Sequence, residues 1–269
     1  MIKFFRHIRQ NMINENRTSK YLLYAFGEII LVVIGILIAL QINNWKENQK
    51  LRHQELTYLN NLKGDLETQI NMLDVYIDYE TIIIDQSNDI IKHYELNRGF
   101  NNMDSVFPKL NDLTTRWTFS NANTTLLQLL NSNQINSIQN VGLKEDLIAF
   151  NQQIDLFAKN TNINNTNLID NITTRAFIST GGIASYGYSS RMIQKFNDFY
   201  PVKGKIVHDN ELKKTLIKTI NEPLNKLETI NKVAYRNMLS NLQKSGNEAI
   251  KTRTEQILKM IENEIDLRS

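Results

Sequence analysis

The sequence contains no cysteine, and only three prolines and ten glycines among its 269 residues. The absence of cysteine excludes disulfide bonds and metal sites built from thiolates. The scarcity of proline and glycine, beside abundant Leu, Ile, Lys and Glu, favours long helices over a β-sandwich or β-barrel. No run of alternating apolar and polar residues is strong enough to predict a strand. We therefore expect an all-α protein.

Motifs of the common enzyme classes are also absent. The sequence has no G-x-S-x-G, Walker or dinucleotide-binding glycine pattern. The four histidines, His7, His53, His93 and His208, lack the spacing of metal ligands. We predict a protein that is not an enzyme and that uses no metal and no cofactor.

Excess positive charge is confined to the N-terminal end. Residues 1–44 carry five basic and two acidic side chains, whereas residues 45–269 carry 26 of each. A nucleic-acid-binding protein would concentrate basic residues in its large domain. We therefore expect no nucleic-acid partner.

One long apolar run stands near the N-terminus. Residues 22–42 would form a helix of about 31 Å, which matches the apolar thickness of a bilayer. Tyr21, Tyr24 and Trp45 stand at its ends, where aromatic side chains anchor a span at the lipid headgroups. No small-residue cleavage pattern follows the run, so it predicts an uncleaved transmembrane helix and not a signal peptide.

The distribution of Lys and Arg around the span predicts its orientation. Five basic residues precede it and three follow closely (Lys46, Lys50 and Arg52), so the N-terminus is expected in the cytoplasm. The chain then divides into a basic arm (1–20), a transmembrane helix (21–43) and an extracytoplasmic, periplasmic domain (44–269). The arm is either an amphipathic helix on the lipid surface or a frayed tail. The predicted location is the inner (cytoplasmic) membrane, crossed once, with membrane lipid as one partner.

Glu28 interrupts the apolar run, about 6 Å from the expected midplane of the bilayer. An acid at this depth is costly and is a candidate for function. Three interpretations stay open: a headgroup-level residue, a protonated or ion-paired residue between two helices, or a proton site of an ion-driven complex. Gly35 and Ala39 share its helical face and form a small-xxx-small pattern for helix packing.

Behind the span, apolar residues recur every three or four positions, as in amphipathic helices. We expect a break at Gly99, a kink at Pro223 and a possible split at Ser245–Gly246. Thr161 and Asn164 form a polar patch that is either a register-setting layer or a break. The expected helices cover 44–97, 124–138, 143–179 and 210–267. Together they predict an elongated antiparallel bundle of three to four helices after the transmembrane helix.

The stretch Ser179–Arg191 is rich in glycine and serine and predicts a loop. Tyr186, Tyr188 and Arg191 in this loop are candidates for partner recognition, because Tyr and Arg are enriched at binding hot spots. The alternative is that they are ordinary loop residues covering one end of the bundle.

Two stretches resemble an uncharacterised bacterial family of single-span membrane proteins, a domain of unknown function. SKYLLYAFGEIILVVIGILIALQINNWKENQK is similar to the N-terminal signature of that family, and Asn121–Phe150 is similar to a second motif. Asn133 stands where the motif is expected to have glycine. The resemblance implies membrane placement and includes Glu28 in the signature, but it implies no chemistry.

These observations predict a membrane-anchored, non-enzymatic protein for interaction or assembly, as a subunit of a larger inner-membrane complex. Its partner would be a second copy of the chain, in a homo-oligomer, or a multi-span membrane protein. The alternatives are an ion-coupled accessory subunit with Glu28 as a proton site, and an extracytoplasmic ligand sensor.

Overall fold

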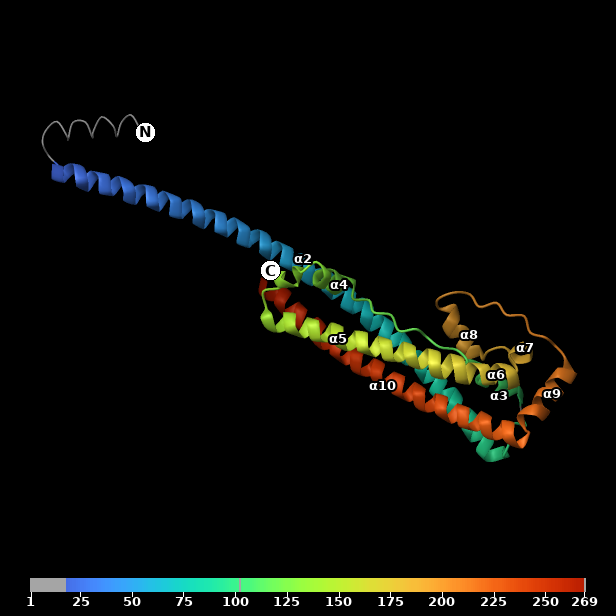
Figure 1. The fold of residues 1–269 in the computed structure, drawn as a ribbon. Helices are drawn as coiled ribbons and strands as arrows, with labels where there is room; N and C mark the ends of the chain where they lie inside the picture. The colour runs from blue at the N-terminus through green and yellow to red at the C-terminus, as the bar shows by residue number, and fades with distance from the viewer. Residues whose placement is uncertain (1–17, 102, 269) are drawn as a thin grey trace. The chain divides into compact units, whose positions relative to one another are not determined.

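The computed structural model describes residues 18–101 and 103–268, shown as a ribbon in Figure 1. The chain divides into two compact units, residues 1–57 and 58–269. All regular structure within the described residues is helical, and they include no strand. The prediction of an all-α protein is therefore confirmed. The predicted arm, residues 1–20, lies outside the described residues up to position 17 and stays a prediction.

The first helix, α2 (Thr18–Asn97), contains 80 residues. Its large apolar side chains from Leu22 to Ile42 are 44–78% exposed. This part of α2 is long and apolar enough to cross a membrane, as the sequence predicts. The helix ends where Arg98 adopts a positive φ of 53°, directly before Gly99, which is the predicted break.

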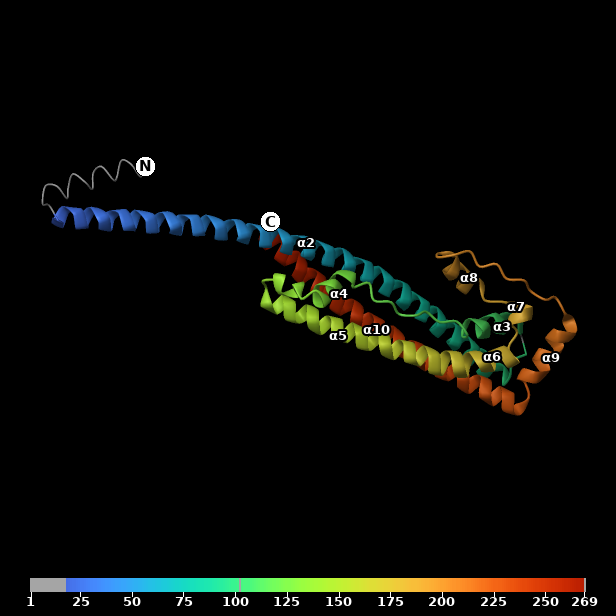
Figure 2. The same cartoon turned by 45° about the horizontal axis from the view of Figure 1, so that its top comes forward.

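The unit 58–269, here called the helical body, contains three long helical segments. They are residues 58–97 of α2, α5 (Val141–Asn164) and α10 (Pro223–Arg268). Figures 1 and 2 show these segments side by side along most of their length. Ion pairs Lys63–Glu262 (2.8 Å) and Lys251–Asp74 (2.7 Å) show that α2 and α10 run in opposite directions.

Leucines three or four residues apart on α2 explain why it packs in the helical body. Leu59, Leu62, Leu66 and Leu73 are fully buried, because they form one apolar stripe on an amphipathic helix. They meet Leu143, Leu147, Phe150 and Ile154 of α5 and Ile250, Ile257 and Ile261 of α10 in one apolar cluster. A second cluster at the other end of the body contains Tyr79, Ile83, Phe107, Phe177 and Val233.

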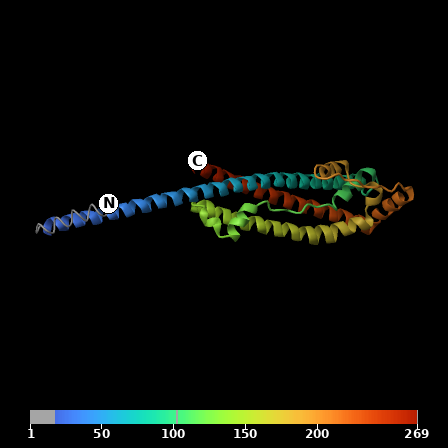
Figure 3. The same ribbon diagram turned by 90° about the horizontal axis from the view of Figure 1, so that it is seen from above.

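Short helices complete the helical body. The predicted loop 179–191 contains α7 and the start of α8, and α9 follows it. Figure 3 shows these three helices gathered at one end of the body with α3 and α6. The short helices are α3 (Met103–Asp112), α4 (Thr124–Asn131), η1 (Gln134–Ser137), α6 (Arg175–Thr180), α7 (Ile183–Tyr186), α8 (Ser190–Asn197) and α9 (Asn210–Ile220).

Asn133, between α4 and η1, has the left-handed backbone that glycine adopts most easily (φ 58°, ψ 16°). Asparagine tolerates this region better than most residues. The backbone conformation therefore explains why the expected glycine can be replaced by asparagine at this turn.

The predicted helix 143–179 continues past its polar patch in a different form. The π-helix η2 (Asn165–Thr174) joins α5 to α6 without a gap. Asn165 is buried, donates to the carbonyl oxygen of Trp117 (2.8 Å) and accepts from Gln243 (3.0 Å). Thr161 and Asn164 lie within α5, so the helix is not broken at the predicted polar patch.

The two expected interruptions of the last helix differ in outcome. The predicted helix 210–267 is interrupted at residues 221–222, between α9 and α10, and Pro223 is the first residue of α10, where its missing N–H costs nothing. The expected split at Ser245–Gly246 is wrong, because α10 continues through both residues. A Cβ at Gly246 would lie 2.3 Å from Cε2 of Phe157 on α5, so this glycine allows the close approach of two helices.

Candidate functional site

Two rows of exposed side chains run along neighbouring helices of the helical body. Positions on both rows are spaced by three and four residues, and every position is exposed and uncharged. We call them together the α5–α10 face. The row on α5 is Ala149, Gln153, Leu156, Asn160 and Ile163, and the row on α10 is Asn231, Tyr235, Met238, Leu242, Ser245, Ala249, Thr252 and Gln256.

Large apolar side chains stand on both rows. Leu156 is 61% exposed and Ile163 46%, while Met238 and Leu242 are 60% and 65% exposed. Side chains at such spacing form the seam of a coiled coil when a partner helix covers them. The face therefore has the pattern of a helix-packing surface on its outer side.

A groove of about 520 Å³ lies between the two rows. Its lining includes Asn160 and Ile163 of the α5 row and Leu242 and Ser245 of the α10 row. Phe157 and Gly246 also line it, and the missing side chain of Gly246 leaves room for the Phe157 ring. An apolar side chain from another molecule could insert into this groove.

Ion pairs join α2 to α8 and α10 on another side of the helical body. There α2 pairs with α8 and α10 through Lys195–Asp78 (2.5 Å), Arg191–Asp85 (2.7 Å) and the two α2–α10 pairs described above. Exposed ion pairs of this kind keep a surface soluble while adding little stability. The thirteen positions of the α5–α10 face are uncharged, although an ion pair between Arg253 of α10 and Asp146 of α5 joins the two helices near one end of the rows.

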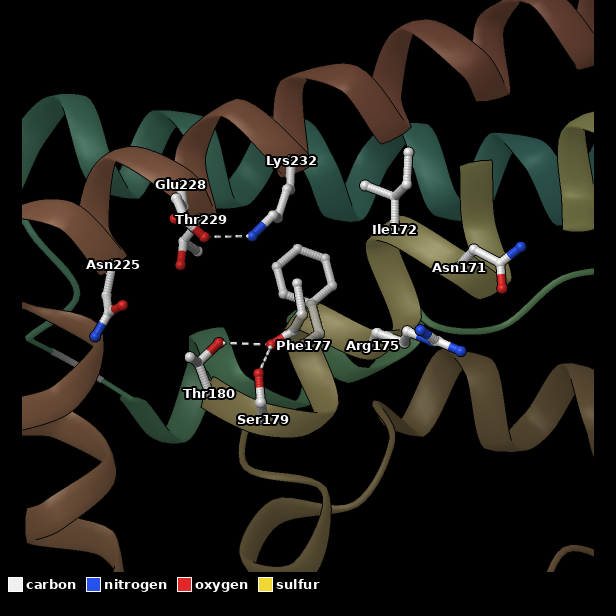
Figure 4. A pocket seen from close by; sticks show the side chains of 11 residues that line it. Asn171, Ile172, Arg175, Phe177, Ser179, Thr180, Asn225, Glu228, Thr229 and Lys232 are labelled. Atoms are coloured by element: carbon white, nitrogen blue, oxygen red, sulfur yellow. Dashed lines mark hydrogen bonds and ion pairs between the residues drawn. The ribbon is translucent and has the colours of Figure 1, made fainter. Parts of the chain in front are cut away.

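A second groove, of about 430 Å³, lies where η2 and α6 meet the first turns of α10. Figure 4 shows Phe177 pointing toward α10 beside the Lys232–Glu228 ion pair (2.7 Å). Arg175 and Thr229 are among the polar residues of the lining. The mixture of charges and hydroxyl groups suits a small polar molecule better than an apolar one.

The predicted recognition loop lies against the helical body. Tyr186 stacks on Phe107 with ring centroids 4.8 Å apart, and the ammonium of Lys213 lies 4.5 Å from the Tyr186 ring. Tyr188 packs edge-on against Phe196, while Arg191 forms its ion pair with Asp85. The two tyrosines are thus half-buried structural contacts, whereas Arg191 is exposed. Their role in recognition stays a prediction.

Gly181 is required by the turn that starts this loop. A Cβ at this position would lie 2.1 Å from the backbone oxygen of Phe177. We expect Gly181→Ala to lower the free energy of unfolding by more than about 1 kcal/mol, because backbone must move to relieve the clash. Gly204→Ala is the matched control, since a Cβ there meets nothing within 4 Å. Urea unfolding of both variants tests this; equal stabilities would contradict it.

Asp112 is buried beneath the loop, at the end of α3. One carboxylate oxygen accepts the backbone N–H of Ser189 (3.0 Å), and the other has no hydrogen-bond partner. Burial raises the pKa of Asp112 from 3.8 to about 6, against the opposing effects of Ser189 and Lys109. The docking of the loop therefore includes a carboxyl group whose pKa is raised to about 6 by burial.

A buried charged cluster stands at the centre of the second apolar cluster. Arg236 of α10 is fully buried, lies 3.6 Å from Glu80 of α2 and donates to Ser240. Another guanidinium nitrogen donates to the backbone oxygen of Thr115 (3.3 Å), whose hydroxyl lies 2.8 Å from that of Tyr79. Burial raises the pKa of Glu80, while Arg236 lowers it. The cluster joins α2, α10 and the segment after α3 through polar contacts.

The predicted membrane residues all belong to α2. Glu28 lies in its exposed apolar part, Gly35 and Ala39 are exposed, and Trp45 is 62% exposed. The side chains of Tyr21 and Tyr24 lie outside those that the structure describes. A Cβ at Gly35 would meet nothing within 4 Å, so this position has room for a contact with another molecule. The roles predicted for these residues stay predictions.

Neither the α5–α10 face nor the two buried acids were singled out from the sequence. The uncharged three-and-four spacing of residues 231–256 was visible there, but the burial of the opposite side of α10 was needed to identify an exposed row. No group of three or more His, Asp or Glu side chains is placed to hold a metal ion among the residues that the structure describes.

The sequence pattern of a family of unknown function, DUF6090, matches residues 28–149 of the chain. The prediction of similarity to a family of unknown function is confirmed for this part, which begins at Glu28 and includes most of the second motif. The bacterial origin and the single span that the resemblance implied stay predictions. No curated protein and no solved structure matches the chain.

Proposed function

We propose that the chain is a single-span, membrane-anchored, non-enzymatic assembly protein. Its exposed apolar helix would anchor it in the inner membrane with the N-terminus in the cytoplasm. The helical body would stand outside the cytoplasm as an antiparallel bundle and would bind other proteins in a larger complex. The observation that carries this proposal is the α5–α10 face, an uncharged, partly apolar surface on two neighbouring helices.

An assembly role explains this face better than catalysis does. Charged residues are depleted and apolar residues gather at the centre of protein–protein interfaces, as on this face. Apolar side chains that are 46–65% exposed gain free energy when a partner removes them from water. The groove between the rows also supplies a shape that a partner side chain can fill.

Two other functions are proposed as alternatives. In the first, the protein is an ion-coupled accessory subunit and Glu28 carries a proton next to a multi-span partner. In the second, it is a sensor, and the mixed polar groove of Figure 4 is where a small ligand would bind. The assembly proposal is preferred because an entire face, and not one residue or one groove, supports it.

Native co-purification from gently solubilised membranes, with mass determination, tests the assembly proposal. We expect wild type to form a complex heavier than the 31.3 kDa chain. Glu28→Gln should retain the complex, whereas Gly35→Leu should reduce it severalfold, because the added side chain would push a neighbouring helix away. A lone chain from wild-type membranes would contradict the proposal.

The same experiment separates the ion-coupled alternative. That alternative requires a stoichiometric multi-span partner, together with a Glu28→Gln variant that assembles normally but loses function. A complex that contains only copies of this chain, in wild type and in Glu28→Gln, would exclude it. In the Gly35→Leu variant the helical body should unfold at the wild-type temperature, which shows that the substitution acts only on assembly.

A further inference from the structure

We propose that a second copy of this chain covers the α5–α10 face, so that the helical body forms a symmetric homodimer through α10 and α5. This inference rests on the proposed assembly function and names the partner that this surface fits. The contact would be centred on Met238 and Leu242, the most exposed apolar side chains of the α10 row.

The lack of charged residues on the two rows favours a second copy of the chain as the binding partner of this face. In a two-fold symmetric contact a patch meets itself, so residues near the axis face their own equivalents. A charged residue there would face a like charge in the partner, which destabilises the contact. The thirteen positions of the two rows are uncharged, so those around Met238 and Leu242 can meet their own equivalents without repulsion.

Other occupants fit this pattern less well. Helices that lie on an anionic membrane surface combine an apolar stripe with Lys and Arg beside it. The exposed charges beside these rows have both signs, with Lys159 and Asp155 on α5 and Glu248 and Glu255 on α10. A strongly charged protein partner would be matched by opposite charges, and the thirteen positions of the rows supply none.

The shape of the face also suits self-association. Leu242 and Ile163 project beside the groove of about 520 Å³ that they help to line. A two-fold axis near Leu242 would bring this side chain of each copy to the groove of the other. The contact would then repeat the insertion of a side chain into a hole that is typical of helix pairs.

Membrane anchoring lowers the affinity that such a contact needs. Two copies held in the same bilayer meet at a much higher effective concentration than two free proteins. A face of modest area, with five large apolar side chains on its two rows, is then sufficient for a dimer.

The absence of native cysteine makes a direct test simple. Met238→Cys and Leu242→Cys are introduced singly into the full chain, and native membranes are treated with a short bismaleimide cross-linker. We expect a band at twice the chain mass for both variants. Asn71→Cys, at an exposed position of α2, is the matched control and should give at least about tenfold less of this band, because only chance collisions would join it.

A charge substitution tests the interface itself. Ser245→Glu in the Met238→Cys chain places like charges close to each other across the axis and should reduce cross-linking about tenfold. Asn71→Glu in the same chain should leave it unchanged. Both positions are exposed, and equal thermal unfolding of the two variants would show that the fold is kept.

Two outcomes would overturn the inference: cross-linking at Met238→Cys no stronger than at Asn71→Cys, or no effect of Ser245→Glu. If cross-linking fails while co-purification finds a different protein, the assembly function stands and the homodimer is wrong. If neither experiment finds any complex, both proposals are wrong.

Discussion

Replacing Arg236 by methionine should destabilise the helical body by about 3–5 kcal/mol, because it leaves the Glu80 carboxylate buried without its counter-ion. Methionine fills similar space, so the loss reports the missing charge and hydrogen bonds and not a large cavity. Urea unfolding of the full chain in detergent micelles, followed by far-ultraviolet circular dichroism, measures the effect. A loss below about 1 kcal/mol would contradict this account of the cluster.

The pH dependence of the Arg236→Met variant supplies a second test. Burial already raises the pKa of Glu80, and removal of Arg236 takes away the main opposing effect. A raised pKa means that the folded state binds the proton more tightly than the unfolded state does, so lower pH favours folding. The deficit of the variant should therefore shrink between pH 8 and pH 5. Lys232→Met on the same helix removes a partly exposed pair and should cost less than about 1 kcal/mol.

Asp112→Asn should stabilise the protein at pH 8 by up to about 3 kcal/mol, which corresponds to the rise in pKa from 3.8 to about 6. Because the folded state binds this proton more tightly, its stabilising contribution is fully present below about pH 4 and is lost as pH rises through 6. Asparagine copies the neutral acid and keeps an oxygen to accept from Ser189. The variant should thus retain at pH 8 the stability that the wild type has only in acid.

The difference between the two unfolding free energies, measured from pH 4.5 to pH 8, isolates Asp112 because the other titrating groups cancel. The difference should grow with pH and level off above 7. Asp112→Ala removes the charge and also the acceptor for the Ser189 N–H, so it should gain less than the asparagine variant. A difference that is constant with pH would show that Asp112 does not titrate in this range.

Periodic apolar residues made much of the helical architecture predictable. The spacing of four leucines predicts the buried stripe of α2 (Leu59, Leu62, Leu66 and Leu73), and Gly99 predicts the end of this helix. The apolar run before Trp45 predicts an exposed helix that could cross a membrane. Such patterns depend on neighbours three and four residues apart, which the sequence contains directly.

Interactions between distant segments could not be predicted in the same way. Gly246 indicates a helix break when only its neighbours in sequence are considered, but Phe157, 89 residues earlier, gives it a packing role. Arg236 has the spacing of a core residue with Val233 and Ser240, yet its burial depends on Glu80 on another helix. The hydrogen bonds of Asn165, at the start of the π-helix, with Gln243 and Trp117 likewise join segments that are distant in sequence.

The α5–α10 face could be predicted from the sequence only in part. Its uncharged spacing is a sequence property, but which side of α10 is covered depends on where α2 and α5 pack. In the recognition loop, the composition predicted binding residues but could not predict that Tyr186 and Tyr188 pack against aromatic rings of the same chain.

The pairing of α2 with α10 has a consequence for how the chain folds during synthesis. Lys63 bonds to Glu262, which is 199 residues later in the sequence. The packing of α2 against α10 can therefore be completed only after the last residues of the chain have been synthesised. At typical translation rates this delay is about 10–40 s. During that interval the side of the stripe that packs on α10 remains exposed to water or to chaperones. Loss of the C-terminal helix would leave that side uncovered permanently, so truncated chains should be aggregation-prone and short-lived.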